Sequence, residues 1–446
     1  MSLVEGGSRP TAEAGFATSR GGLLRPLRIR EFRMLWTGMT VSLFGDGMFL
    51  VAIAWQVYAI SNSPSALATV GLAMTIPHIA FLLVGGAVSD RLDRRRIMVA
   101  ADVVRGLAVV VLGTLAATST IELWHVLLLT AVYGAGTAFF GPAFDAIVPE
   151  LVPEDQLQKA NSLDQLIRPA ALLLAGPAVG GWLIGGFGLG AVFLLDAVTF
   201  AVSVCALLMM RPGARRANES IGLALSDVRE GLLYIRSRVW LWGTFLAATI
   251  AYLLFWGPIE VLLPYVVKND MHGSARDLGY IFAVGGIGAI FAAIVMGRRS
   301  QPRRHITFMY VVWTISTVAI AGYGLARYPW QAMLAAFAFN ALEASGMIVW
   351  ATTKQRLVPN RLLGRVSSLD WFISIGLLPL SFALTGPVAA ALGARTTLVA
   401  AGIVGGIATL SFLFLPGMRD TERVAAEVAP AGAADRDLVV GASTGE

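Results

Sequence analysis

Residues 86–96 read GAVSDRLDRRR, and they join two long apolar stretches, 66–89 and 97–118. Four arginines and two aspartates therefore fall within a few residues of segments that carry almost no charge. An apolar helix of about 20 residues is long enough to cross about 30 Å of hydrocarbon. The pattern predicts a pair of membrane-spanning helices joined by a tight basic turn.

The rest of the chain repeats this alternation of apolar and basic segments. Of its 446 residues 56% are hydrophobic and 14% are charged, and the mean hydropathy is +0.71; soluble proteins carry about 25% charged residues. Only helices satisfy all their backbone groups inside hydrocarbon in segments of this kind. We therefore expect an all-α membrane protein with twelve spans, at 34–60, 66–89, 97–118, 123–143, 163–187, 189–210, 239–267, 278–297, 306–325, 330–352, 368–392 and 396–416.

The basic residues predict the orientation of these spans. Arginines crowd the N-terminal tail and the second, sixth, eighth and tenth loops, whereas the first, third and fifth loops carry no Lys or Arg. Cytoplasmic loops retain such an excess of positive charge. We expect a multi-pass protein of the inner or plasma membrane with both termini in the cytoplasm. The net charge of +6 belongs to these loops, which argues against a nucleic-acid partner.

Several other classes of protein are disfavoured by what the sequence lacks. Cys205 is the single cysteine, so no intrachain disulfide can form, and the four histidines have no metal-ligand spacing. No glycine precedes Lys159, Lys268 or Lys354, as a phosphate-binding loop requires. We expect neither an enzyme nor an ATPase, and no metal or cofactor.

An internal repeat divides the chain into halves. Residues 152–164 resemble 358–370, and residues 27–36 resemble 233–242 at the same offset. Each half holds six spans, an even number, so both halves enter the membrane from the same side and form two parallel six-helix bundles. We expect a cytoplasmic tail (1–33), a first bundle (34–210), a cytoplasmic linker with an amphipathic helix (211–238), a second bundle (239–416) and a disordered cytoplasmic tail (417–446).

Carboxylates within the spans are the candidate chemical groups. Asp46 lies well inside the first span, Glu260 inside the seventh and Glu343 inside the tenth. Ionisable groups at this depth are usually functional, and burial favours the neutral carboxyl, which can then exchange protons near neutral pH. The alternative is a neutral or paired structural carboxyl. Asp102 and Arg105 are three residues apart on one helix and could form such a pair, and Asp196 is a further candidate.

Polar and aromatic residues share helical faces with these carboxylates. Asp46 belongs to a row of four residues spaced by three, four and three positions, which places them on one helix face, and Glu343 belongs to a second row with the same spacing. Glu260 shares a helix face with two aromatic residues. A carboxylate among aromatic and Met side chains suits a large apolar cation, although aromatic residues at this spacing can also simply pack against lipid. The expected substrate-binding residues are Phe49, Gln56, Tyr133, Phe140, Tyr252, Trp256, Asn340, Met347 and Trp350.

Residues 86–96 resemble the loop signature of the major facilitator superfamily, Gly-x-x-x-Asp-Arg-x-Gly-Arg-Arg/Lys. Gly86, Asp90, Arg91, Arg94 and Arg95 match it, while Asp93 stands where the family often has Gly. The resemblance implies a gate at which arginines pair across helices and separate when the helices move. Asp145, at the same end of the fourth span, is a candidate arginine partner. An ordinary basic loop is the alternative.

A second motif lies in the fifth span. Gly176, Pro177, Gly180 and Gly181 match the Gly-Pro-x-x-Gly-Gly core of the superfamily's antiporter motif, although Leu172 replaces its upstream glycine. Small residues allow close helix contact, and a proline bends a helix. A generic packing kink is the alternative to antiport.

The segment 140–143 and its surroundings resemble prokaryotic twelve-helix drug and siderophore exporters. This resemblance implies proton-driven export of amphipathic small molecules by alternating access, in a lipid-embedded monomer. A dedicated exporter of an endogenous siderophore, antibiotic or lipid, a proton symporter for uptake, and a non-transporting receptor or scaffold remain as alternatives.

The predicted alternation of loops can be tested by accessibility labelling. Single cysteines introduced beside Arg91 and beside Ala66, in a Cys205→Ser background, should react with an impermeant thiol reagent from opposite sides of the membrane. Reaction of both from one side would contradict the assigned spans.

Overall fold

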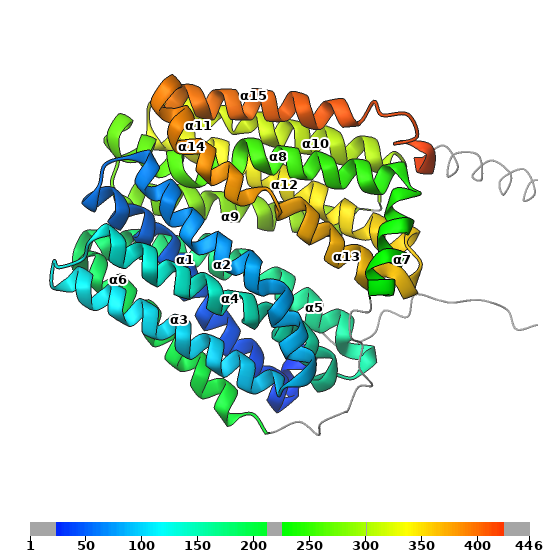
Figure 1. Ribbon diagram of the computed structural model, residues 1–446, viewed down its shortest axis with the longest axis horizontal. Coiled ribbons are helices and arrows are strands. Elements are labelled where there is room, and N and C mark those ends of the chain that lie inside the picture. Colours follow the sequence, from blue (N-terminus) through cyan, green and yellow to red (C-terminus); the bar gives the residue numbers. More distant parts are fainter. Residues whose placement is uncertain (1–23, 212–224, 300, 423–446) are drawn as a thin grey trace, which may run out of the picture.

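The computed structural model describes residues 24–211, 225–299 and 301–422 (Figure 1). The expected tails at 1–23 and 423–446 and part of the linker, 212–224, lie outside the described residues. The remainder is a bundle of long helices in two groups, one above the other in Figure 1. The helices of the first group are α1 (Arg30–Ile60), α2 (Pro64–Arg91), α3 (Arg94–Ala117), α4 (Leu123–Leu151), α5 (Glu154–Arg168) and α6 (Gly176–Met209), with the 3-10 turn η1 (Arg25–Arg28) before α1 and the π-helical turn η2 (Pro169–Ala175) before α6.

The second group continues from a short connecting helix, α7 (Leu225–Arg236), which lies within the expected linker. Its elements are α8 (Val239–Tyr265), η3 (Val266–Asp270), α9 (Ala275–Gly297), α10 (His305–Ala319), α11 (Ala321–Leu325), α12 (Pro329–Leu357), α13 (Asn360–Ile375), α14 (Leu378–Leu392) and α15 (Ala394–Phe412). The start of the expected C-terminal tail packs against this group, since Glu422 accepts hydrogen bonds from the backbone and hydroxyl of Thr307.

Eleven described segments are long and apolar enough to cross a membrane, and the longest of them holds two of the predicted spans. That segment, Lys159–Met209, has 51 residues and breaks at Gly188, whose φ of +82° is accessible mainly to glycine. Counted as two spans, this segment brings the number of helices long and apolar enough to cross a membrane to twelve among the described residues, in agreement with the prediction. Several helices are longer than their predicted spans; α4 reaches Leu151 and a helix begins already at Glu154, because hydropathy detects only the apolar part of a helix.

The internal repeat is visible in the helix boundaries. Helices α4 and α12 each have 29 residues, and both ends of α12 lie 206 residues after those of α4. The start of α13 follows the start of α5 by the same interval. The sequence repeat is thus a structural repeat, and the two six-span groups are called the first and second halves below.

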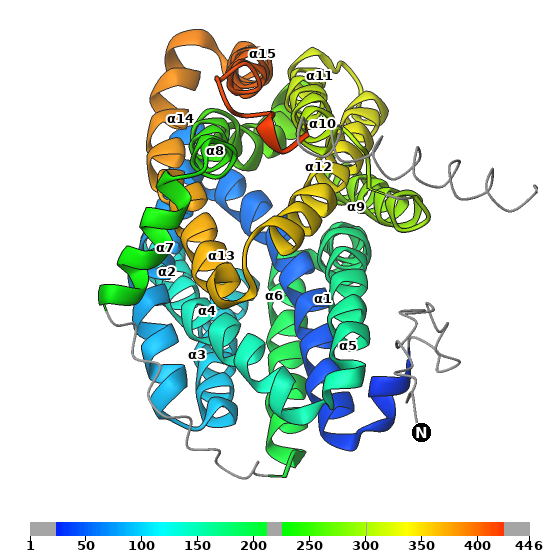
Figure 2. The same ribbon diagram turned by 90° about the vertical axis from the view of Figure 1, so that its right-hand side faces the viewer.

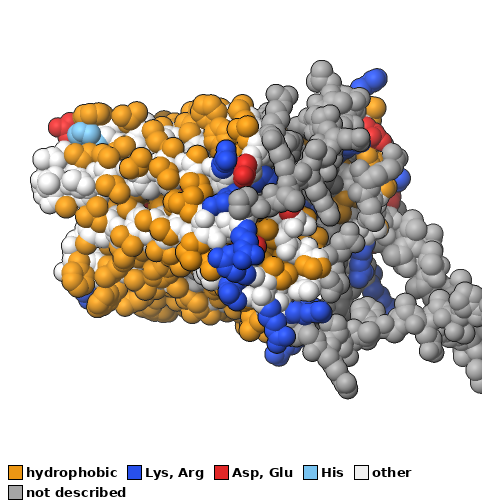
Figure 3. Space-filling model, turned by 90° about the horizontal axis from the view of Figure 1, so that it is seen from below, with side chains coloured by type: hydrophobic (Ala, Val, Ile, Leu, Met, Phe, Trp, Pro, Cys, Tyr) orange, Lys and Arg blue, Asp and Glu red, His pale blue; other side chains and the backbone are white. Residues whose placement is uncertain are grey.

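Charge divides the molecule along its long axis. Lys and Arg side chains gather toward one end of the molecule, here called the basic end, whereas hydrophobic side chains cover much of the surface between it and the opposite end (Figure 3). In the view from the basic end, the two halves lie one above the other (Figure 2).

The two halves are joined at the end opposite the basic loops. There the Tyr58 hydroxyl donates to the Val261 carbonyl (2.6 Å), Asn62 donates to Asn269 (2.6 Å), and the Lys268 ammonium donates to the Tyr58 carbonyl. One hydrophobic cluster spans both halves in this region. Toward the basic end the buried side chains form two separate clusters, one in each half. The halves are therefore packed together at one end and have separate cores at the other.

Glycine contacts set the close packing of the helices, and Gly134 on α4 offers a test. A Cβ atom at Gly134 would lie 2.0 Å from the Met74 carbonyl oxygen on α2, whereas a Cβ at Gly141 on the same helix would meet no atom within 4 Å. Gly134→Ala should lower stability by about 1–3 kcal/mol because the backbone of α2 must move. Gly141→Ala should leave it unchanged or raise it by about 0.5–1 kcal/mol. Melting of the two variants in detergent measures the difference, and equal melting would contradict the packing.

Candidate polar centre and gate

Asp46 lies on α1 at the centre of a polar cluster in the first half. The Tyr133 hydroxyl on α4 donates a hydrogen bond to Asp46 Oδ1 (2.5 Å), and the ring of Tyr133 stacks on Phe49 with centroids 4.7 Å apart. Arg105 on α3 approaches the other carboxylate oxygen, with Nη1 3.8 Å from Oδ2. Three helices thus converge on one carboxyl, and the Asp46 side chain is 17% exposed, the least shielded acid of the cluster.

Arg105 is the cation of this cluster, and its position in the sequence indicated only a possible pair with Asp102. Its guanidinium donates to Asp102 Oδ1, which confirms the pairing predicted from their spacing, and the other oxygen of Asp102 accepts from the Ser203 hydroxyl on α6 (2.6 Å). The guanidinium carbon lies 4.8 Å from the ring centroid of Phe140 and 4.7 Å from that of Phe200. Aromatic faces and carboxylates together compensate for removing this charge from water.

Asp196 on α6 is the third carboxyl of the cluster. It is fully buried, its Oδ1 accepts from the Thr199 hydroxyl (3.2 Å), and its Oδ2 has no hydrogen-bond partner among the described residues. The carboxyl lies against α1, because a Cβ atom at Gly45 would stand 2.2 Å from Asp196 Oδ1. Since a buried ionised carboxylate requires compensation, one arginine cannot satisfy all three acids in their charged forms.

The second half places its carboxyls differently. Glu260 on α8 and Glu343 on α12 are both partly buried, and neither has a hydrogen-bond or ion-pair partner among the described residues. Aromatic residues of the same two helices contact one another: Tyr252 contacts Trp256 edge to face (centroids 5.2 Å apart), and Phe255 on α8 contacts Phe339 on α12 (5.9 Å). Trp256 is 37% exposed. Two unpaired carboxyls and several aromatic faces therefore belong to this half.

The other expected substrate-binding residues occupy varied environments. Trp350 is buried, donates from its indole nitrogen to Asp370 (2.9 Å) and packs against Trp240 and Phe245. Phe49, Gln56 and Tyr133 are also buried, whereas Phe140, Tyr252, Asn340 and Met347 are partly exposed. Residues chosen by the same helical spacing therefore include both buried core residues and partly exposed ones.

Arginines of the basic turn are bound to neighbouring helices. Arg94 donates to the Ala146 carbonyl (2.9 Å) and pairs with Glu150 (2.6 Å) on α4, so its partner is Glu150 rather than Asp145. Arg95 donates to the carbonyl oxygens of Leu207 and Leu208 on α6. Gly86, Asp90 and Arg91 lie at the end of α2, and their side chains are outside the described part of the chain. The basic turn thus holds the ends of α4 and α6 to α3.

The Gly-Pro motif begins α6, directly after the π-helical turn η2, and packs on both halves. A Cβ atom at Gly176 or Gly180 would collide with α1, at 2.5 Å from the Phe44 carbonyl oxygen and 2.8 Å from Met48 Cα. A Cβ at Gly181 would lie 2.5 Å from the Ala275 carbonyl oxygen on α9, and one at Gly279 would lie 2.4 Å from the Pro177 carbonyl oxygen. The motif therefore allows α6 to contact its own half and the opposite half at once.

The fold and motifs agree with comparisons to known proteins. Residues 21–438 match the sequence model of a family described as transmembrane secretion effector, and the chain belongs to this family of the major facilitator superfamily. It is a multi-pass membrane protein of a transporter family and not an enzyme.

Relatives of the chain include several efflux proteins. The multidrug efflux pump Tap of Mycolicibacterium fortuitum is 27% identical over 426 residues, which cover 91% of this chain and 98% of the pump. Macrolide efflux protein A of Streptococcus pyogenes is 26% identical over 270 residues, 60% of this chain and 66% of the relative. The MFS-type transporter YfiS of Bacillus subtilis is 29% identical over 275 residues, 59% of this chain and 63% of the relative. The last two alignments thus span just under two thirds of those relatives.

Solved structures support the fold alone. A POT family transporter superposes with a TM-score of 0.66 at 15% identity, with 86% of this chain and 96% of that chain covered. A bacterial homologue of the human lysosomal transporter Spinster superposes with a TM-score of 0.60 at 16% identity, with 90% and 98% covered.

The buried arginine generates a stability prediction. Arg105→Met removes the cation that compensates two carboxyls, so the free energy of unfolding should fall by about 3–5 kcal/mol. Arg96→Met, on the same helix, removes a side chain that is 88% exposed and should change stability by less than about 0.5 kcal/mol. Thermal melting of both variants in detergent compares the two changes; equal midpoints would show that Arg105 is not a central ion-pair partner.

Proposed function

We propose that the protein exports amphipathic organic molecules in exchange for protons, by alternating access to a site between its two halves. The single observation that carries this proposal is the position of Asp46, which is bound at once by Tyr133 and Arg105 on two other helices. A proton added to this carboxyl removes its attraction for Arg105 and changes the charge of a cluster that links α1, α3, α4 and α6. Proton binding can thereby bias the arrangement of these helices.

The direction of transport follows from charge and from the relatives. Basic loops are retained in the cytoplasm, so the basic end, where the halves have separate cores, faces the cytoplasm in the proposed orientation. Substrate enters there and leaves after the packed end opens. Multidrug and macrolide efflux relatives support export rather than uptake. The protein then acts as a lipid-embedded monomer, with residues 34–210 and 239–416 as its moving halves.

The second half supplies the proposed substrate surface. Glu260 and Glu343 have no protein partner among the described residues, and Tyr252 and Trp256 precede Glu260 by two turns and one turn on α8. A cationic amphipathic molecule would place its charge near these carboxyls and its apolar part on the rings. Asn340 and Met347 on α12, with Phe140 and Tyr133 on α4, complete the proposed lining. The gate motif and the Gly-Pro motif act in the movement and do not contact substrate.

Substitution of the central carboxyl tests the coupling. Asp46→Asn keeps the hydrogen-bonding shape but cannot release a proton, so the variant should insert and melt normally yet lose at least about 90% of macrolide or ethidium transport driven by a pH gradient in proteoliposomes. Glu122→Gln, at the far end of α4, is the matched control and should transport like wild type. Wild-type rates in the Asp46→Asn variant would contradict the assignment.

A further inference from the structure

Asp196 on α6 is as deeply buried as Asp102 on α3, but it lacks the partners that Asp102 has. Both residues are 0% exposed. Asp102 accepts from the Arg105 guanidinium and from the Ser203 hydroxyl (2.6 Å). Oδ2 of Asp196, in contrast, has no hydrogen-bond partner among the described residues. The two acids therefore share a degree of burial and differ in what compensates a negative charge.

The other carboxyl oxygen of Asp196 is compensated weakly. The Thr199 hydroxyl has one hydrogen to donate, and it contacts both the backbone carbonyl of Asp196 (2.7 Å) and its Oδ1 (3.2 Å). The shorter contact has the better length for a hydrogen bond between two oxygens, so it takes most of that hydrogen. An ionised carboxylate is costly to bury without hydrogen bonds of its own. These surroundings favour the neutral, protonated form of Asp196.

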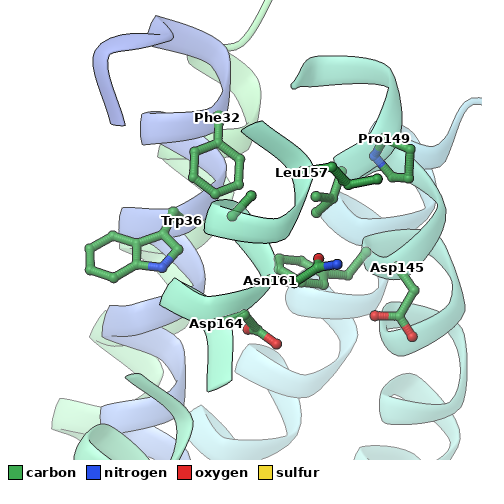
Figure 4. A pocket seen from close by; sticks show the side chains of 10 residues that line it. Phe32, Trp36, Asp145, Pro149, Leu157, Asn161 and Asp164 are labelled. Atoms are coloured by element: carbon green, nitrogen blue, oxygen red, sulfur yellow. The ribbon is translucent and has the colours of Figure 1, made fainter. Parts of the chain in front are cut away.

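The acids nearer the basic end of the first half are in a different condition. Figure 4 shows Asp145 on α4 and Asp164 on α5 in the lining of a cavity that α1 also borders. Asp145 is exposed, and Asp164 pairs with Arg168 (2.8 Å). Water or an arginine compensates each of these charges, so neither acid needs a bound proton as Asp196 does.

Aromatic side chains on both sides of Asp196 connect it to the polar cluster of the first half. Phe193 lies three residues before Asp196 and Phe200 four residues after it, so the three side chains share one face of α6. The Phe193 ring packs on Phe49 (centroids 5.9 Å apart). The Phe200 ring packs on Tyr133 (6.1 Å). Asp196 therefore lies on the face of α6 that packs on the cluster.

The charges of this cluster can be counted. Titratable side chains reach the same face of α6 from three other helices: Asp46 on α1, Asp102 and Arg105 on α3, and Tyr133 on α4. Arg276 on α9 lies instead against Gly185, beyond the break in α6. With all three aspartates ionised and one arginine, the cluster carries two excess negative charges. A proton on Asp196 removes one of them, and a proton on Asp46 removes the other.

Asp196 also lies against the helix that carries Asp46. A Cβ atom at Gly45 would stand 2.2 Å from Asp196 Oδ1, so the glycine leaves room for the carboxyl. Gly45 directly precedes Asp46 in the chain. Helix α6 itself contacts the second half through the Gly-Pro motif. A movement of α6 against α1 during transport therefore changes the surroundings of both carboxyls together.

We propose that Asp196 carries a second exchangeable proton, in addition to the one on Asp46, so that two protons enter for each substrate molecule that leaves. With both acids protonated the cluster is neutral, because the charges of Asp102 and Arg105 cancel. With both ionised it holds two excess negative charges. This inference rests on the proposed antiport and adds its stoichiometry.

Infrared spectra of the purified full chain in detergent test for the proton itself. At neutral pH the spectrum of wild type minus that of Asp196→Asn should contain the carbonyl-stretching band of a protonated carboxyl, and the band should shift in D2O. Glu122 is exposed, so wild type minus Glu122→Gln should contain no such band. A difference spectrum for Asp196→Asn without the band would show that Asp196 is ionised and would overturn the proposal.

Ethidium, a permanent monocation, tests the stoichiometry in proteoliposomes. If two protons enter for each ethidium that leaves, one net positive charge enters per cycle. A membrane potential alone should then drive wild-type transport at equal pH on both sides. Asp196→Asn should keep transport driven by a pH gradient and lose transport driven by the potential. With the potential clamped at zero, the ethidium gradient sustained by one pH unit should fall from about 100-fold in wild type to about tenfold in the variant.

The same measurements separate this inference from the antiport on which it rests. Wild-type transport that follows the pH gradient but ignores the potential would remove the second proton and leave the antiport standing; this measurement needs no variant, so it holds if Asp196→Asn fails to fold. Potential-driven transport at the wild-type rate in Asp196→Asn would also contradict the proposal. So would loss of pH-driven transport in a folded Asp196→Asn protein, because Asp196 would then be required for the first proton. Wild type without any pH-driven flux would refute the antiport itself.

Discussion

Hydrocarbon offers no hydrogen bonds, and this constraint governs the structure from the backbone to the polar centre. Backbone groups satisfy it by forming helices, and polar side chains satisfy it by finding partners on neighbouring helices. Arg105 illustrates the second case, since two carboxylates and two aromatic faces from α1, α3, α4 and α6 surround its guanidinium. Among the described residues, a few buried groups have no partner, and such groups, for example Asp196 Oδ2, are places where a proton or a ligand can be accommodated.

Close helix packing positions these polar groups. Gly45 lets the Asp196 carboxyl reach α1, and Gly176 and Gly180 let the start of α6 lie against the same helix. Gly181 and Gly279 extend this packing to the second half. Helix α1 therefore carries Asp46 and also contributes Tyr58 to the contact between halves. A change in charge at Asp46 acts on a helix that contacts both halves, which is the physical basis for the proposed coupling.

Much of this architecture could be predicted from the sequence because the membrane imposes a length and a composition on every span. The repeat predicted two halves, and the spacing of Asp102 and Arg105 predicted their ion pair, since residues three apart share a helix face. The contacts of Asp46 with Tyr133 and Arg105 join distant helices, and no local pattern encodes them. Trp350 has the same spacing from Glu343 as Ile53 has from Asp46, yet it is bonded to Asp370 in a packed core. Spacing identifies a face but not what that face contacts.

The central claim is that movement of substrate out and movement of protons in are one process. Proteoliposomes loaded with a pH-sensitive dye, without an imposed pH gradient, measure it directly when a macrolide gradient is applied. The account predicts that protons move in the direction opposite to the macrolide. The resulting change of internal pH should disappear when a protonophore is added. Macrolide flux at full rate with no accompanying change of internal pH would contradict it.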